Sequence, residues 1–245
     1  MTSLTLNTQK REGGFTLLEL LIVIAIIAIL SIALVFLLNP AETLKKARDA
    51  QRISDLKTLK TALGVMLTAT STPSLDGTFG ATLTGICTTS GSGLAATAPK
   101  IAYSAATAPT VVSTGGGSDS GSTASATSTF SSTGAVSATP GSVNGSGWIP
   151  VNLKALTGGS PIANFPIDPI NTVSASAVST DLTYRYACQN GSTTSKPSFI
   201  FEIDARLESN AYTVDDNKMA KDGGDNDNYY ETGNSLSLLP NGTGF

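Results

Sequence analysis

A run of 24 residues, Phe15–Leu38, contains Glu19 as its only charged residue, and this run constrains the fold more than any other feature of the chain. As an α-helix it would be about 36 Å long, whereas the hydrocarbon core of a bilayer is about 30 Å thick. A carboxylate at the centre of a bilayer costs on the order of 2.5–3.5 kcal/mol, so it needs a partner and indicates a function. The sequence therefore predicts a membrane-spanning helix with one functional carboxylate.

The residues before this helix form a short charged leader that ends in two glycines. The stretch from Lys10 to Glu19, KREGGFTLLE, resembles the class III signal of type IV pilins and type II secretion pseudopilins. The resemblance implies that a prepilin peptidase cleaves after Gly14 and methylates the new N-terminus, Phe15. It also implies that Glu19, the fifth residue of the mature chain, is required for assembly.

Two other kinds of N-terminal segment explain less of the sequence. A cleaved secretory signal has about 7–15 apolar residues before a small-residue cleavage site. Here the best such triplet, Ser31-Ile32-Ala33, is followed by further apolar residues up to Leu38. An ordinary signal anchor fits the length of the run but gives no reason for Gly13-Gly14-Phe15 or for Glu19.

The charges near the two ends of the span conflict with a cytoplasmic leader. The leader offers Lys10 and Arg11. The basic residues beyond the span are Lys45, Lys46, Arg48 and Arg52. The positive-inside rule would therefore place the C-terminal part in the cytoplasm. Because a leader peptidase that works at the cytoplasmic face needs Gly14 there, we expect the opposite orientation, with the head outside the cytoplasm.

The composition argues against an enzyme and against a specific nucleic-acid partner. Charged residues make up only 13% of the 245 residues, the net charge is −3, and histidine, the commonest general base and metal ligand, is absent. No GxSxG, Walker or HExxH pattern occurs. A pI near 4.9 leaves no basic footprint for nucleic acid over the whole chain.

The only two cysteines, Cys87 and Cys188, fit a single disulfide in an oxidising compartment. Such a bond would close a loop of about 100 residues and stabilise the fold by up to about 4.7 kcal/mol in the chain-entropy model. Two unpaired buried thiols are the alternative that the sequence leaves open.

A second helical segment is predicted over residues 39–67. Asn39-Pro40 interrupts or kinks the helix, because Pro40 lacks an N–H and disfavours helical geometry at the preceding residue. An apolar face then recurs at three- and four-residue steps. It comprises Ile53, Leu56, Leu59 (or Lys60), Leu63 and Met66-Leu67. The other face, expected to be solvated, comprises Lys45, Arg48, Asp49, Arg52, Asp55, Lys57 and Lys60. The alternative is that this face contacts lipid headgroups or the next subunit.

Beyond this helix the chain divides into a loop region, residues 68–147, and a head, residues 148–245. The loop region is rich in Ser, Thr and Gly. Its part 101–147 lacks the apolar area needed to offset the entropy of ordering, which favours a flexible insertion over short polar strands.

Alternating residues in the head predict two strands with one apolar face each. The first face comprises Leu182, Tyr184, Tyr186 and Cys188, and the second comprises Phe199, Phe201, Ile203, Ala205 and Leu207, opposite Glu202, Asp204, Arg206 and Glu208. A third strand is expected near 211–214. Because one-sided strands need a cover, the apolar face of the second helix should pack on them. The predicted fold is α+β and pilin-like, a long N-terminal helix on a small antiparallel sheet.

The late loop Asp222–Glu231 is acidic and contains two glycines. Hard oxygen ligands in a loop that turns tightly suit Ca²⁺, and we expect Asp222, Asp225 and Asp227 to bind it. Pro166-Ile167-Asp168-Pro169, then Tyr184-Arg185-Tyr186, and then this loop form a combination that is similar to the head of the major pseudopilin of type II secretion. This resemblance implies calcium in such a loop. The alternative is an acidic turn satisfied by backbone N–H groups and water.

Two functional classes remain. The first is a structural subunit that is processed by a prepilin peptidase and polymerises, through a membrane assembly platform, with itself and with other pilin-like subunits. It would lie in the lipid bilayer before assembly and in an extracellular or periplasmic filament afterwards. The alternative is a single-pass membrane-anchored binding or adhesion module that does not polymerise. Pilus, DNA-uptake pilus and pseudopilus roles stay open.

Overall fold

The structure, a computed structural model, describes residues 13–71, 73–76, 86–87, 100–110, 130, 134–190 and 199–240. Most of the predicted leader and much of the low-complexity region, including residues 111–129, lie outside the described residues. The chain forms two compact units, Met1–Thr43 and Leu44–Phe245. The first unit contains an apolar helix, and the second is the head.

The first helix, α1 (Leu17–Leu38), has no buried residue. Together with its continuation it is the one helix in the described part of the chain that is long and apolar enough to cross a membrane. It ends at Asn39, which adopts the left-handed conformation (φ 38°, ψ 71°) that asparagine tolerates better than most residues. Pro40 begins α2 (Pro40–Ala69), and the Asn39 side chain accepts a hydrogen bond from the N–H of Glu42 at 3.4 Å. The helix is therefore interrupted where Asn39-Pro40 predicted.

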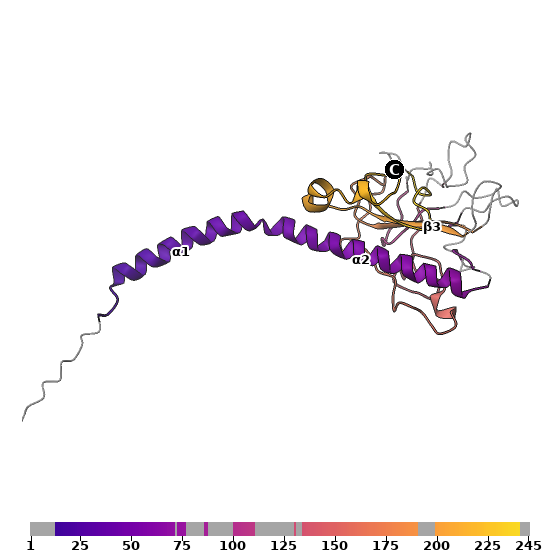
Figure 1. Cartoon of the computed structure of the whole chain (residues 1–245), viewed down its shortest axis with the longest axis horizontal. Helices are drawn as coiled ribbons and strands as arrows, with labels where there is room; N and C mark the ends of the chain where they lie inside the picture. The colour runs from indigo at the N-terminus through magenta and orange to yellow at the C-terminus, as the bar shows by residue number, and fades with distance from the viewer. Residues whose placement is uncertain are drawn as a thin grey trace, which may run out of the picture. The chain divides into compact units, whose positions relative to one another are not determined.

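In the head, α2 lies along one face of a four-stranded antiparallel sheet (Figure 1). The strands β1 (Ala102–Tyr103), β2 (Tyr184–Gln189), β3 (Ile200–Ala205) and β4 (Tyr230–Gly233) neighbour one another in chain order. The first core, between helix and sheet, includes Leu56, Leu59, Leu63, Trp148, Tyr184, Tyr186, Phe201 and Ile203. The α+β fold, with the helix packed on an antiparallel sheet, is confirmed.

The opposite face of the sheet is also buried, which the alternation of the strands did not predict. All residues of β2 and β3 are buried. A second core covers this face with Ile101, Tyr103, Ala105, Phe130, Ala177, Ala187, Ile200, Leu238 and Leu239. Asp204 lies inside it as the partner of Arg185, and Glu202 accepts the N–H groups of Leu238 and Leu239 at 2.6 and 2.8 Å. The C-terminal segment thus turns a predicted polar face into an interior one.

The third strand predicted near 211–214 is wrong. Residues Ala211–Asp215 form a single π-helical turn. The carbonyl of Ser209 accepts the N–H of Thr213 at 3.0 Å and its hydroxyl at 2.8 Å, so local hydrogen bonds replace strand pairing. The strand that completes the sheet is β4, which pairs with β3 from Ala205↔Tyr230 onward.

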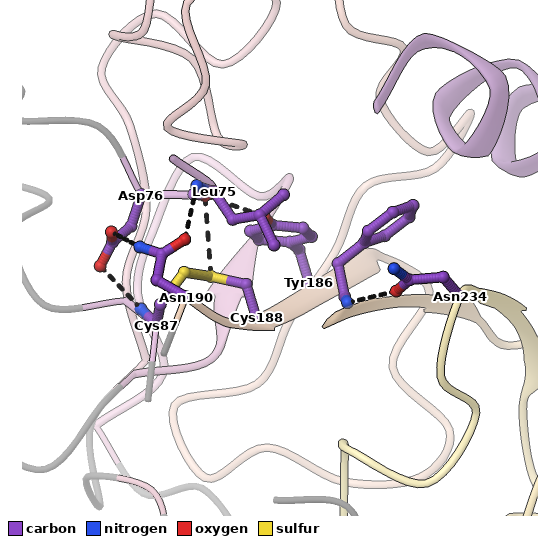
Figure 2. Close-up of a disulfide and its surroundings, with 8 residues drawn as sticks. Leu75, Asp76, Cys87, Tyr186, Cys188, Asn190 and Asn234 are labelled. Atoms are coloured by element: carbon purple, nitrogen blue, oxygen red, sulfur yellow. Dashed lines mark hydrogen bonds between the residues drawn. A yellow bond between two sulfur atoms is a disulfide. The ribbon is translucent and has the colours of Figure 1, made fainter. Parts of the chain in front are cut away.

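A disulfide joins Cys87 to Cys188 at the end of β2 (Figure 2). The chain that leaves α2 is held beside it, because the carbonyl of Leu75 accepts the Tyr186 hydroxyl at 2.9 Å and its N–H donates to Asn190 at 2.7 Å. Burial of both cysteines shows that the bond is part of the core. The alternative of two unpaired thiols does not hold.

Candidate functional site

The residues around the predicted cleavage point are exposed and lie outside regular structure. Phe15 is 86% exposed, and Gly13 and Gly14 precede α1 without regular structure. A Cβ added at either glycine would meet no atom within 4 Å, and neither has a positive φ. The fold therefore does not require glycine at these two positions. The presence of two glycines has to be explained by something other than the folded structure.

The partner of Glu19 in the structure is Thr16, which caps α1. The Glu19 carboxylate accepts the Thr16 N–H and the Thr16 hydroxyl, both at 2.9 Å, while the Glu19 N–H donates to that hydroxyl at 3.2 Å. This is a capping box, which satisfies N–H groups that the first turn of a helix leaves free. The sequence predicted that Glu19 needs a partner, but Thr16 was not identified as that partner, although Thr-x-x-Glu before an apolar run is the signature of a capping box.

Cleavage after Gly14 would leave the capping box intact, because both Thr16 and Glu19 belong to the mature chain. The new amine would be that of Phe15, one residue from the N–H that already contacts the carboxylate. An ammonium group and a carboxylate held this close attract each other strongly once water is excluded. The site can thus position one negative charge beside a processed N-terminus.

The surface of α1 is unsuited to water along its whole length. Its large apolar side chains are exposed from Leu17 to Leu38, and none is covered by the rest of the described chain. An apolar surface of this extent must be covered by lipid or by other helices. The structure shows the surface, and its cover has to come from outside the chain.

Two of the basic residues beyond the span are held in ion pairs inside the head. Arg52 is fully buried and donates to Asp168 at 2.6 and 3.0 Å, to Asp49 at 2.8 Å and to Glu208 at 2.8 Å. Arg48 donates to Glu208 at 2.6 and 2.8 Å. These bonds, first that from Arg48, hold the pKa of Glu208 below its ordinary value. The solvated face predicted for α2 is therefore wrong at Asp49 and Arg52.

The side chain of Asp222 closes the acidic loop by hydrogen bonds to backbone N–H groups of the same loop. Asp222 accepts the N–H of Gly224 at 2.8 Å and the N–H of Glu231 at 2.6 Å, while Asp225 and Asp227 are exposed. A Cβ at Gly224 would lie 1.6 Å from the Glu231 carboxylate, so a side chain at this position would require the Glu231 side chain to move. Within the described residues, no three acidic, cysteine or histidine side chains are grouped so that they could hold a metal ion.

Calcium binding by Asp222, Asp225 and Asp227 therefore stays a prediction, and it would require these side chains to move together. If it occurs, the melting temperature of the head should rise in millimolar Ca²⁺ and less in Mg²⁺. Mass action gives about 2.7 kcal/mol at a hundredfold excess over the dissociation constant. Changing Asp225→Ala and Asp227→Ala together should remove the rise. Equal melting curves in chelator and in calcium would leave the loop as a turn only.

Comparison with known proteins gave a match to the N-terminal segment. Residues 9–35 match the family model described as "Prokaryotic N-terminal methylation motif". No curated protein and no solved structure matches the chain. The matched range includes the two leader glycines, Phe15, the capping box and most of α1. Residues 9–35 therefore carry the class III prepilin-like signal of type IV pilins and pseudopilins.

Proposed function

We propose that this chain is the precursor of a structural subunit of a filament, either a type IV pilus-like fibre or a type II secretion pseudopilus. A prepilin peptidase would remove the leader, and a membrane assembly platform would add the subunit through α1. The observation that carries the proposal is the methylation motif over residues 9–35, placed directly at the start of an apolar helix that the chain leaves uncovered.

Three features of the site support this function. The leader glycines are not required by any neighbour in the structure, as expected where a peptidase recognises them. The apolar surface of α1 suits lipid before assembly and neighbouring α1 helices afterwards. Glu19 lies at the start of the helix, within reach of a processed N-terminus, where its charge could fix the stagger between subunits.

The proposal places the head outside the cytoplasm, and the ion pairs of Arg48 and Arg52 are compatible with that orientation. Both guanidinium groups are used by the folded head, so their presence after the span has a structural reason. Apart from these two arginines, the basic residues just beyond the span are Lys45 and Lys46, and they equal in number Lys10 and Arg11 of the leader. Counted in this way, the basic residues do not oppose a head outside the cytoplasm.

Processing is the direct test. In the native host, the chain should be cleaved between Gly14 and Phe15, which removes 14 of the 245 residues, and the Phe15 amine should be methylated. Intact mass and the N-terminal peptide measure both changes. Gly14→Val should block cleavage, whereas Gly13→Val is the matched control, because a side chain at either position meets no neighbour and leaves the fold unchanged.

Retention of Met1 in the native protein, or a cut after Ala33, would overturn the proposed processing. Normal processing without filaments would instead favour the anchored binding module. The two classes are thus separated by mass analysis followed by electron microscopy of sheared surface material.

A further inference from the structure

The chain contains three triplets that match the acceptor pattern for N-linked glycosylation, Asn-x-Ser/Thr. They begin at Asn144, Asn190 and Asn241. In this modification the side-chain Nδ2 of the asparagine forms the bond to the sugar, so that atom has to be accessible. Asn241 lies outside the described residues. The fold uses the amide groups of the other two asparagines in different ways.

The amide group of Asn190 is bonded within the fold at both of its ends. Its Oδ1 accepts the N–H of Leu75 at 2.7 Å, and its Nδ2 donates to the Asp76 carboxylate. Figure 2 shows Asn190 beside these residues and beside the disulfide of Cys87 and Cys188. A sugar on Nδ2 would have to displace the Asp76 carboxylate from a part-buried site. The fold therefore disfavours Asn190 as an acceptor.

The amide group of Asn144 is bonded at its oxygen only. The Oδ1 atom accepts the N–H of Ser146 at 3.1 Å, the Ser146 hydroxyl at 2.7 Å and the Ser142 hydroxyl at 2.6 Å. Because a backbone N–H can only donate, the first of these bonds identifies the atom as the oxygen. The Asn144 side chain is exposed, and its Nδ2 donates to none of the described residues. The turn thus holds the amide and the hydroxyl of the triplet together and leaves the acceptor nitrogen unused.

The backbone of this turn is anchored on both sides. Buried Val143 directly precedes the acceptor asparagine, and its carbonyl accepts the N–H of Leu153 at 2.9 Å. Buried Trp148 follows the triplet and donates its N–H to the carbonyl of Pro140 at 3.0 Å. Gly145, the middle residue of the triplet, has φ 96°, in the left-handed region that suits glycine. The fold therefore presents the asparagine at the surface, where a large group on its side chain requires no change in the core.

The sequence around the turn gives a bulky hydrophilic group a purpose. No charged residue occurs between Asp119 and Lys154, and charged residues make up only 13% of the chain. A surface with so few charges has little to keep copies of the protein apart in water. An oligosaccharide is bulky and solubilising, so it would supply hydration that the side chains of this region do not.

We propose that Asn144 carries an N-linked oligosaccharide. In the transfer, Nδ2 would form a bond to the anomeric carbon of an oligosaccharide linked to a lipid diphosphate. The bond from that carbon to the diphosphate oxygen would break, the lipid diphosphate would leave, and Nδ2 would lose one proton to a base of the transferase. The proposal rests on the head lying outside the cytoplasm, as in the proposed function, where an oligosaccharyltransferase would meet it.

The test uses the full-length chain purified from its native host. Cleavage by chymotrypsin after Phe130 and Trp148 gives the peptide 131–148, in which Asn144 is the only asparagine. Mass spectrometry should find an oligosaccharide on this peptide, and fragmentation that preserves the sugar should locate it on Asn144. Asn144→Gln and Ser146→Ala should each abolish the added mass.

Two variants are matched controls. Ser146→Thr should keep the added mass, because threonine preserves the acceptor pattern. Ser142→Ala should also keep it, because its hydroxyl bonds the same Oδ1 but lies outside the triplet.

The possible failures are distinguishable. An unmodified peptide 131–148 from a chain that is cleaved after Gly14 would overturn the glycan and leave the proposed function standing. An unmodified peptide from a chain that retains Met1 would overturn both. Added mass that persists in Asn144→Gln would place the modification on hydroxyl groups and overturn the N-linkage. An oligosaccharide on Asn190 alone would overturn the role given to the exposed turn.

Discussion

Glu19→Ala should leave the chain inserted in the membrane and abolish filament formation. Insertion should persist because the change removes the only charge of the span. Assembly should fail because a buried ammonium ion at the processed Phe15 would lose its counter-charge, and breaking one partner of a buried pair costs about 3–5 kcal/mol, or about 10²–10⁴-fold in an association constant. The yield of sheared filaments, compared with the amount of subunit in the membrane, measures the effect.

Glu19→Gln distinguishes two roles of Glu19, its negative charge and its hydrogen bonds in the helix cap. A glutamine carbonyl can still accept the Thr16 N–H and hydroxyl, which Glu19 accepts at 2.9 Å, but it carries no charge. If charge is what assembly needs, Glu19→Gln should fail as Glu19→Ala does, and Thr16→Ala, which removes the hydroxyl of the cap, should reduce the yield much less. Normal filaments from Glu19→Gln would show that the carboxylate acts as a helix cap and would contradict the ion-pair role.

The parts of the fold that the sequence predicted are those with an uninterrupted pattern. The apolar run fixed the extent of α1, and Pro40 marked its break at Asn39. Alternation at Tyr184, Tyr186, Phe201 and Ile203 found β2, β3 and the face that packs on α2, because a period of two places these side chains on one side of a sheet. Local periodicity was sufficient for these elements.

Elements that depend on distant contacts were missed. The strand β1 is only Ala102–Tyr103 and lies in a region without a strand pattern, so only its pairing with β2 defines it. The burial of Glu202 and Asp204 depends on a C-terminal segment that returns over the sheet. The segment Ala211–Asp215 has residues typical of a strand, yet hydrogen bonds to the Ser209 carbonyl hold it in a turn. In the first two cases tertiary structure decided the outcome, whereas in the third local hydrogen bonds overrode the strand pattern.

The spacing of residues along α2 could have predicted that its buried face extends to Asp49 and Arg52. Buried positions follow one another at steps of three and four residues along the helix, which is the period of a single face. They are Asp49, Arg52, Leu56, Leu59, Leu63 and Met66, with buried Ala62 beside Leu63 on the same face. The first two were assigned to solvent because they are charged. A charged pair at interior spacing should instead have prompted a search for partners, and Asp168 in the Pro-Ile-Asp-Pro turn supplied one.

Removing the charge of Arg52 should therefore strongly destabilise the head. Arg52→Met keeps much of the side-chain volume but leaves Asp49 and Asp168 buried without their cation, which is expected to cost about 3–5 kcal/mol of unfolding free energy. Denaturant unfolding of the full-length chain in detergent measures this cost. Trp148, the only tryptophan and fully buried in the first core, reports on the head by its fluorescence.

Two changes on the same helix serve as controls. Lys57→Met alters an exposed residue and should stay within about 0.5 kcal/mol of the unmodified chain. Arg48→Met removes a guanidinium that is 30% exposed and bound to Glu208 alone among the described carboxylates, so its cost should be much smaller than that of Arg52→Met. The order Arg52, Arg48, Lys57 follows from burial. An Arg52→Met midpoint equal to that of Lys57→Met would mean that the desolvation of the buried cluster cancels its attractions, and that the apolar face alone holds α2 on the sheet.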